Sequence, residues 1–216
     1  EAGGVGDKYP GEQVATPEGY ARNPEQVINF YNERRKQLLD VVPNAGHLGV
    51  ADLERDFNVT VVTQNVDNLH ERAGSTHVIH LHGELTKVCS SRDPYNPHFV
   101  KELAPEEYEV KLGDKAGDGT QLRPFIVWFG ESVPEIETAI RYVEQADIFV
   151  IIGTSLNVYP AAGLLNYVPR AAEVYLIDPK PVDTHVMRPI HVIQKGASEG
   201  VKELKALLTV TQPPLP

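Results

Sequence analysis

The chain is poor in sulfur. Its 216 residues include one cysteine, Cys89, and one methionine. A single cysteine excludes a disulfide within the chain, and it also excludes a zinc site built mainly from cysteine thiolates. The fold must therefore rely on core packing and turns.

Positive charge and long apolar runs are also scarce. Lysine and arginine number 20 against 30 aspartates and glutamates, which gives a formal net charge of −10. This balance argues against general affinity for nucleic-acid phosphate or for an anionic membrane surface. No apolar run approaches the roughly 20 residues that cross a bilayer, and no signal peptide is visible. We therefore expect a cytoplasmic protein with no nucleic-acid or membrane partner.

The first residues have the composition of a loop. The sequence starts at Glu1 without a methionine, and the run to Thr16 contains glycine, proline and charge with no period. One interpretation is a natural flexible terminus, and the other is that something upstream is absent. The last residues, 209–216, are expected to form a disordered tail because they are rich in proline.

Apolar runs alternate with helical patterns along most of the chain. Strands are predicted at 59–63, 78–81, 125–129, 148–152, 173–177 and 190–193. Helices are predicted at 25–41, from about Asn44, and at 67–73, 134–145, 160–168 and 198–208. Such an alternation predicts the α/β class, with a Rossmann-like, doubly wound, mostly parallel sheet. The long irregular stretch at 86–122 is typical of a functional insertion or a small subdomain.

Polar side chains follow one of these predicted strands directly. Gln64, Asn65 and Asp67 come just after the strand at 59–63. Ligands bind beyond the carboxyl ends of strands in open α/β sheets, so these residues are candidates for a binding site. An equally good interpretation of Asp67 is that it caps the helix at 67–73.

Two histidines close the next predicted strand. His80 and His82 alternate, so they should face opposite sides of one strand, and at most one can point into a cleft. A histidine at a strand end is more often a hydrogen-bonded structural residue than a base. The pair also has the spacing of two metal ligands, but no third ligand is evident at suitable spacing.

A glycine and two hydroxyls follow the most apolar strand. Gly153, Thr154 and Ser155 can let a ligand approach the backbone and bond ribose or phosphate oxygens. Taken alone, the same three residues are equally typical of a turn that ends a strand. No complete G-x-G-x-x-G motif follows any strand, and no Walker A motif is present.

Five blocks of sequence resemble, in order, the signature of the sirtuin family. They are TQNVDNLH at 63–70, LHG at 81–83, VWFGE at 127–131, GTS at 153–155 and GAS at 196–198. Sirtuins are NAD-dependent protein-lysine deacylases with a Rossmann domain and a small lobe. The resemblance implies one catalytic domain over 1–216, with a Rossmann-like lobe at 43–83 and 123–208 and a small lobe at 7–42 and 84–122.

The resemblance assigns roles to the polar residues. His82 would be the general base, which accepts a proton from the NAD ribose while the acyl oxygen displaces nicotinamide to give O-acyl-ADP-ribose. Residues expected to contact NAD are Gln64, Asn65, Asp67, Gly153, Thr154, Ser155, Asp178, Ala197 and Ser198. His80 would have a structural role.

The resemblance also implies how the substrate is bound. An acylated-lysine protein or peptide would be clamped by strand addition, which relies on backbone hydrogen bonds. Residues expected to form the clamp are Val127, Phe129, Gly130, Glu131 and Val158. The family resemblance favours a monomer.

The first long predicted helix carries a possible acyl-selectivity element. Tyr31 and Arg34 are three residues apart and share one helix face, where from spacing alone they would be a core aromatic beside a solvated arginine. The segment FYNER at 30–34 resembles the element by which desuccinylase-type sirtuins read acidic acyl groups. A phenol and a guanidinium can jointly bind a carboxylate. Ala15 would leave space in the same pocket, and acetyl-lysine would still be accepted.

The sequence departs from the family in two places. Many sirtuins hold a zinc ion with four cysteines in the small lobe, where this chain offers only Cys89 and His98, so we expect no zinc. The family also begins with a strand and a glycine-rich loop, G-A-G-x-S-x-x-S-G-I-x-x-F-R, which cradles the NAD diphosphate and is not found in these 216 residues. Two alternatives to a deacylase therefore stand beside it: a module that binds ADP-ribose or acyl-lysine peptide without turnover, and an ADP-ribosyltransferase.

Overall fold

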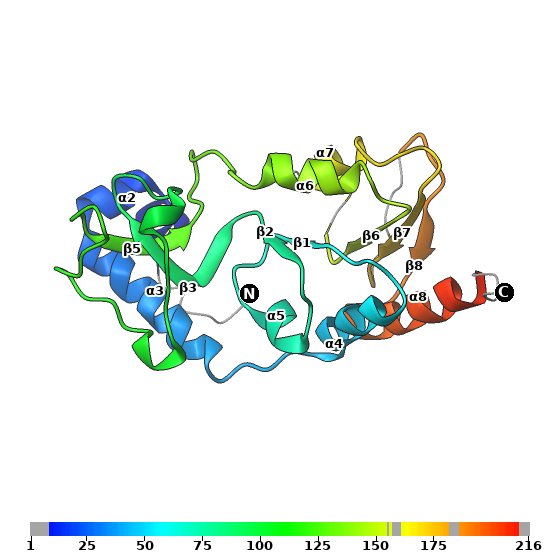
Figure 1. Cartoon of the computed structure of the whole chain (residues 1–216), viewed down its shortest axis with the longest axis horizontal. Coiled ribbons are helices and arrows are strands. Elements are labelled where there is room, and N and C mark those ends of the chain that lie inside the picture. The colour runs from blue at the N-terminus through cyan, green and yellow to red at the C-terminus, as the bar shows by residue number, and fades with distance from the viewer. Residues whose placement is uncertain (1–8, 155, 157–160, 182–185, 212–216) are drawn as a thin grey trace. The chain divides into compact units, whose positions relative to one another are not determined.

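The computed structural model describes residues 9–154, 156, 161–181 and 186–211 (Figure 1). The chain divides into two compact units. The first unit consists of Glu1–Val42, Val62–Asn68 and His80–Pro134, and the second of Pro43–Val61, Leu69–Ile79 and Glu135–Pro216. The first unit contains both segments of the predicted small lobe, 7–42 and 84–122. It also takes in the polar turn that follows the strand predicted at 59–63 and the segment at 123–134.

The first unit begins with three helices: α1 (Gly11–Val14), α2 (Pro17–Arg22) and α3 (Pro24–Leu38). The expectation of a loop up to Thr16 is therefore wrong for α1. Proline occupies the first position of both α2 and α3, where its missing N–H costs nothing. The Thr16 hydroxyl accepts a bond from Gly19 N (2.9 Å) and so caps α2.

An antiparallel sheet packs against α3. Its order is β4-β3-β5, formed by β4 (Lys101–Glu102), β3 (Gly83–Ser90) and β5 (Leu122–Ile126). The irregular stretch predicted at 86–122 therefore begins inside a strand, and the strand predicted at 125–129 lies at Leu122–Ile126 instead. A small core joins Ile28 of α3 to Val88 of β3.

Buried polar side chains of α3 hold a loop of the first unit. The Asn32 side chain donates to the Val110 carbonyl (2.8 Å) and accepts from the Val110 N–H (2.9 Å). Arg35 donates to the Tyr108 carbonyl (2.8 Å), and burial lowers the Arg35 pKa to about 10. These bonds replace secondary structure in the long loop, because its backbone groups find partners on a helix.

The second unit is built on a parallel sheet of order β6-β7-β8. Its strands are β6 (Ile148–Ile152), β7 (Glu173–Ile177) and β8 (His191–Ile193). Figure 1 shows α8 (Ala197–Thr211) and α4 (Ala45–Asp52) on one side of this sheet, and α6 (Ile136–Val143) and α7 (Ala161–Leu165) on the other. α8 extends past 208, so the prediction of disorder is wrong for 209–211, while 212–216 lie outside the described residues.

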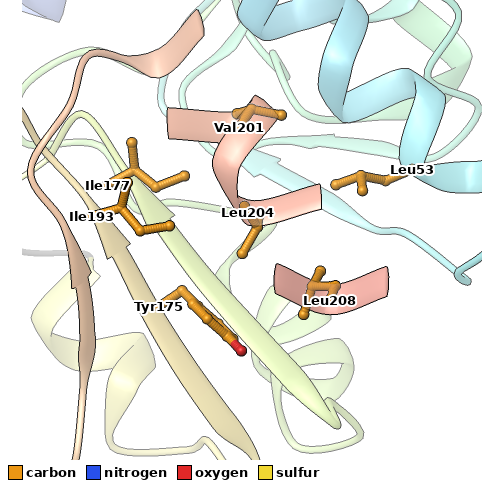
Figure 2. Packing of buried hydrophobic residues seen from close by; sticks show 7 residues of the cluster. All are labelled: Leu53, Tyr175, Ile177, Ile193, Val201, Leu204 and Leu208. Atoms are coloured by element: carbon orange, nitrogen blue, oxygen red, sulfur yellow. The ribbon is translucent and has the colours of Figure 1, made fainter. Parts of the chain in front are cut away.

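The core of the second unit joins the sheet to α8. Figure 2 shows Val201, Leu204 and Leu208 of α8 facing Tyr175, Ile177 and Ile193 of the sheet, with Leu53 beside them. The helix lies close because Gly200 has no side chain: a Cβ there would stand 2.2 Å from Ile177 Cγ2. The apolar runs from which the strands were predicted therefore supply the sheet residues that pack against α8.

Two short strands complete the described fold. β1 (Val61–Thr63) pairs with β2 (Val78–His80), and α5 (Leu69–Ala73) lies between them in the sequence. α5 begins two residues later than the helix predicted at 67–73 and ends with it at Ala73, just before Gly74, whose φ of 111° suits glycine. Within the described parts of the chain, no helix is both long and apolar enough to cross a membrane.

Candidate functional site

The polar turn after β1 is fixed by hydrogen bonds to its backbone. The Asn65 N–H donates to the Thr63 hydroxyl (3.0 Å), and the Asn65 carbonyl lies 3.0 Å from Nδ1 of buried His80. The side chains of Gln64 and Asn65 are exposed, and Asp67 is half-buried. This arrangement leaves the two carboxamides exposed while the backbone beneath them is held, and it places His80 against the turn.

His82 lies in a turn and not in a strand. β2 ends at His80, so the prediction that both histidines belong to one strand is wrong. The turn is tight because Gly83 follows with a φ of 89°, and a Cβ there would lie 2.1 Å from the Phe125 carbonyl oxygen. Burial lowers the pKa of the half-buried His82 imidazole, which therefore favours the neutral form that can accept a proton.

The predicted substrate segment is joined to His82 and Ala15 through the backbone. The Val127 N–H donates to the His82 carbonyl, and the Phe129 N–H donates to the Ala15 carbonyl, both at 2.9 Å. The Phe129 side chain is 71% exposed, and Gly130 has a φ of 87°. The structure thus joins the predicted residues His82 and Ala15 to the substrate segment within the first unit. Because the N–H groups of Val127 and Phe129 are already engaged, an added peptide strand would have to pair with other backbone groups of this segment.

Tyr31 lies in the interior and its hydroxyl is engaged. It is 5% exposed; the hydroxyl donates to the Val14 carbonyl (3.0 Å) and accepts from Trp128 Nε1 (3.0 Å). Burial raises the pKa of the phenol. The half-buried Arg34 places its guanidinium 5.7 Å from the centre of the Phe30 ring. Both residues stand on α3, but in this conformation the only phenol proton is bound to a backbone carbonyl.

The Glu131 carboxylate is bound by other residues of its own unit. It accepts bonds from the Arg123 guanidinium, the Tyr95 hydroxyl and the Trp128 N–H. Burial opposes its ionisation, but these donors outweigh that effect and lower the Glu131 pKa. Arg123 and Tyr95 were missed by the sequence reasoning. An arginine inside the apolar run at 122–129 was the available signal, because a buried arginine needs an acceptor.

The second unit places its predicted residues at one edge of its parallel sheet. Gly153 and Thr154 follow β6, Asp178 follows β7, and Ala197 and Ser198 open α8 directly after β8. Gly153 has a φ of 68°, and a Cβ built on it would meet no atom within 4 Å. This edge is where parallel sheets bind nucleotides, and glycine, hydroxyl and carboxylate groups suit the ribose and phosphates of NAD. Ser155 and Val158 lie outside the described residues.

Comparison with known proteins agrees with this arrangement. The model of the Sir2 family matches residues 1–160. An NAD-dependent protein deacylase of Bacteroides thetaiotaomicron is 82% identical over 208 residues, which cover 96% of this chain and 89% of the relative. The solved structure of a mutant Sir2 homologue with ADP-ribose superposes with a TM-score of 0.80 at 32% identity, covering 99% of this chain and 87% of the other.

A Sir2 homologue solved in complex with NAD gives a TM-score of 0.78 at 34% identity, over 97% of this chain and 82% of that one. These neighbours confirm the predicted Rossmann-like α/β fold. The five sequence blocks, the family match and the structural similarity lead to one conclusion: the chain belongs to the Sir2 family.

Proposed function

We propose that this protein is an NAD-dependent protein-lysine deacylase that prefers acidic acyl groups, such as succinyl and malonyl, and also accepts acetyl. The observation that carries the proposal is the environment of His82. Burial lowers the pKa of the half-buried His82 imidazole, and the backbone carbonyl of His82 accepts a hydrogen bond from the N–H of Val127, in the segment expected to hold the acyl-lysine. Such a base is positioned by the same backbone that would position the substrate.

Several residues would hold NAD, which supplies an electrophilic sugar carbon and a nicotinamide leaving group. Gln64, Asn65 and Asp67 would contact the nicotinamide and its ribose. The remainder of the dinucleotide would be contacted by Gly153, Thr154, Ser155, Asp178, Ala197 and Ser198. The carboxamides fix orientation, and His82 accepts the proton that leaves a ribose hydroxyl.

Arg34 would supply most of the preference for acidic acyl groups. Its guanidinium is permanently charged and can bind a carboxylate through two parallel hydrogen bonds. Tyr31 would add a second donor only if its proton turns from the Val14 carbonyl toward the acyl group. The buried Tyr31 therefore depends on a rearrangement of its hydroxyl proton. Ala15 leaves space in the same region because its side chain is a single methyl group.

The test is nicotinamide release from NAD in the presence of peptides carrying succinyl-, malonyl- or acetyl-lysine. We expect release with all three and the highest kcat/KM with the acidic acyl groups. His82→Asn should abolish release, whereas the matched variant His98→Asn, at an exposed 3₁₀ turn of the first unit, should not. If the wild-type chain releases no nicotinamide with any peptide, the proposal fails. The cytoplasmic location and the monomeric state stay predictions.

A further inference from the structure

Arg123 is among the most deeply buried charged side chains that the structure describes, at 3% exposed. Its Nη1 and Nη2 donate to the two carboxylate oxygens of Glu131 at 3.0 and 3.1 Å. Nη2 also donates to the Ile126 carbonyl (2.7 Å), and Nε donates to the Pro124 carbonyl (3.3 Å). The guanidinium lies 3.8 Å from the centre of the Trp128 ring. One side chain thus binds both ends of the segment that contains Val127–Gly130.

The Glu131 carboxylate also accepts hydrogen bonds from residues other than Arg123. Its Oε1 accepts from the Tyr95 hydroxyl and from the Trp128 N–H, both at 2.8 Å, in addition to Arg123. Burying an ion pair costs free energy unless the remaining lone pairs of the carboxylate also accept hydrogen bonds. Here the Tyr95 hydroxyl and the Trp128 N–H, which are both neutral, donate those bonds to Glu131. Removing either charge would leave the other buried without its partner.

The segment between these two residues has little structure of its own. β5 ends at Ile126, and residues 127–130 belong to no strand or helix. Gly130 sits in the left-handed region and Phe129 is exposed, so within this segment only Trp128, which is 2% exposed and packs against Tyr20, anchors the backbone by side-chain packing. The bonds to Arg123 and Glu131, together with the backbone bonds to His82 and Ala15, fix the rest of its path.

We propose that Arg123 and Glu131 are positioning residues that hold Val127–Gly130 in the conformation that binds the substrate peptide. The inference rests on the proposed function and deepens it. Glu131 acts through Trp128 and does not contact the peptide. Because Trp128 Nε1 also donates to the Tyr31 hydroxyl, the same pair supports one wall of the expected acyl site.

Kinetics provide the first test. Glu131→Gln keeps the shape of the side chain and one acceptor oxygen but removes the negative charge. We expect this variant to raise the KM for the acyl peptide about tenfold. The KM for NAD should change by less than about twofold. Glu102→Gln, on exposed β4, is the matched control and should change neither. Arg123→Lys should raise the same peptide KM. The double variant should be no worse than the poorer single variant, because the two residues act as one unit.

Independent contact of Glu131 with the peptide predicts a different result. The effects of Arg123→Lys and Glu131→Gln would then multiply, and Tyr95→Phe would have no effect on the peptide KM. On our proposal, Tyr95→Phe raises that KM by a smaller factor, since it removes one of the bonds that fix Glu131. Multiplying effects or an unchanged peptide KM in Glu131→Gln would overturn the proposal.

Peptide binding without turnover separates this inference from the proposed function. Trp128 is the only tryptophan in the chain, so its fluorescence reports on this segment alone. We expect acyl peptide to change the wild-type emission without NAD, and we expect Glu131→Gln to shift the emission to longer wavelength and to weaken peptide binding. A wild type that binds peptide but releases no nicotinamide would refute the deacylase and leave the positioning role intact. Unchanged emission and affinity in Glu131→Gln, or a wild type that binds no peptide, would refute the positioning role.

Discussion

Replacing Arg34 with methionine separates acyl selectivity from stability. The guanidinium lies 5.7 Å over the Phe30 ring of a half-buried helix face, an interaction that contributes about 0.5 kcal/mol at such sites. Loss of this one contact should lower the free energy of unfolding by about 0.5 kcal/mol. A charged hydrogen bond to a carboxylate contributes about 1.5–3 kcal/mol, so kcat/KM for a succinyl peptide should fall about 10- to 100-fold.

The acetyl peptide is the internal control. It has no carboxylate, so Arg34→Met should leave its kcat/KM within about twofold of wild type. Arg22→Met, at the exposed end of α2, controls for the loss of one positive charge from the same unit. Nicotinamide release would be followed for both peptides, with thermal unfolding measured beside it. Equal losses on the two peptides would refute the assignment of Arg34 to the acyl carboxylate.

Tyr31→Phe should behave differently because the phenol is part of the folded framework. The substitution leaves the Val14 carbonyl and Trp128 Nε1 without their buried partner. Two lost hydrogen bonds amount to about 2 kcal/mol, or a melting temperature lower by about 4–8 °C in a chain of this length. Both peptides should then be affected. A variant as stable as wild type would contradict the hydrogen bonding described for Tyr31.

Four further expectations concern protonation, packing and metal. Burial lowers the His82 pKa, so kcat/KM should fall on acidification with a midpoint below pH 6.5; a midpoint above 6.5 would contradict this. Gly200→Ala should destabilise the chain by about 1–3 kcal/mol in chemical denaturation, because its Cβ would meet Ile177, whereas Gly196→Ala has open space and should cost little. Burial raises the Cys89 pKa to about 12, so a thiol reagent at pH 8 should label it only after unfolding; rapid native labelling would disprove that. Prolonged chelation should change neither the melting temperature nor nicotinamide release, and a loss of either would reveal a structural metal.

The parts of the fold that periodicity predicted well are those whose environment is uniform. The strands at 148–152 and 173–177 agree with the prediction residue for residue, because each contains a run of at least four consecutive apolar residues, as expected of a strand covered on both faces. β3 was missed because its sequence, GELTKVCS, mixes apolar and polar residues, and because its partners β4 and β5 lie far along the chain. A pairing of that kind has no local signature.

The candidate site shows the same limit. The sequence blocks identified His82 and the segment 127–131, but they gave no indication that β5 would end at Ile126. The chain leaves the sheet there because Arg123 takes the Ile126 carbonyl and the Glu131 carboxylate takes the Trp128 N–H. Side-chain bonds of this kind compete with a strand ladder for the backbone, and their partners are brought together only by the fold.

A network of side-chain hydrogen bonds holds the loop of the first unit. The fully buried Ser90 donates to Asp118 (2.5 Å), and its oxygen accepts from the backbone N–H groups of Arg92 and Asp93. The Thr120 hydroxyl donates to the same carboxylate (2.7 Å). The bonds from Ser90 and Thr120 lower the Asp118 pKa, so the network is complete when Asp118 is ionised. One serine thereby ties the end of β3 to a loop nearly 30 residues away.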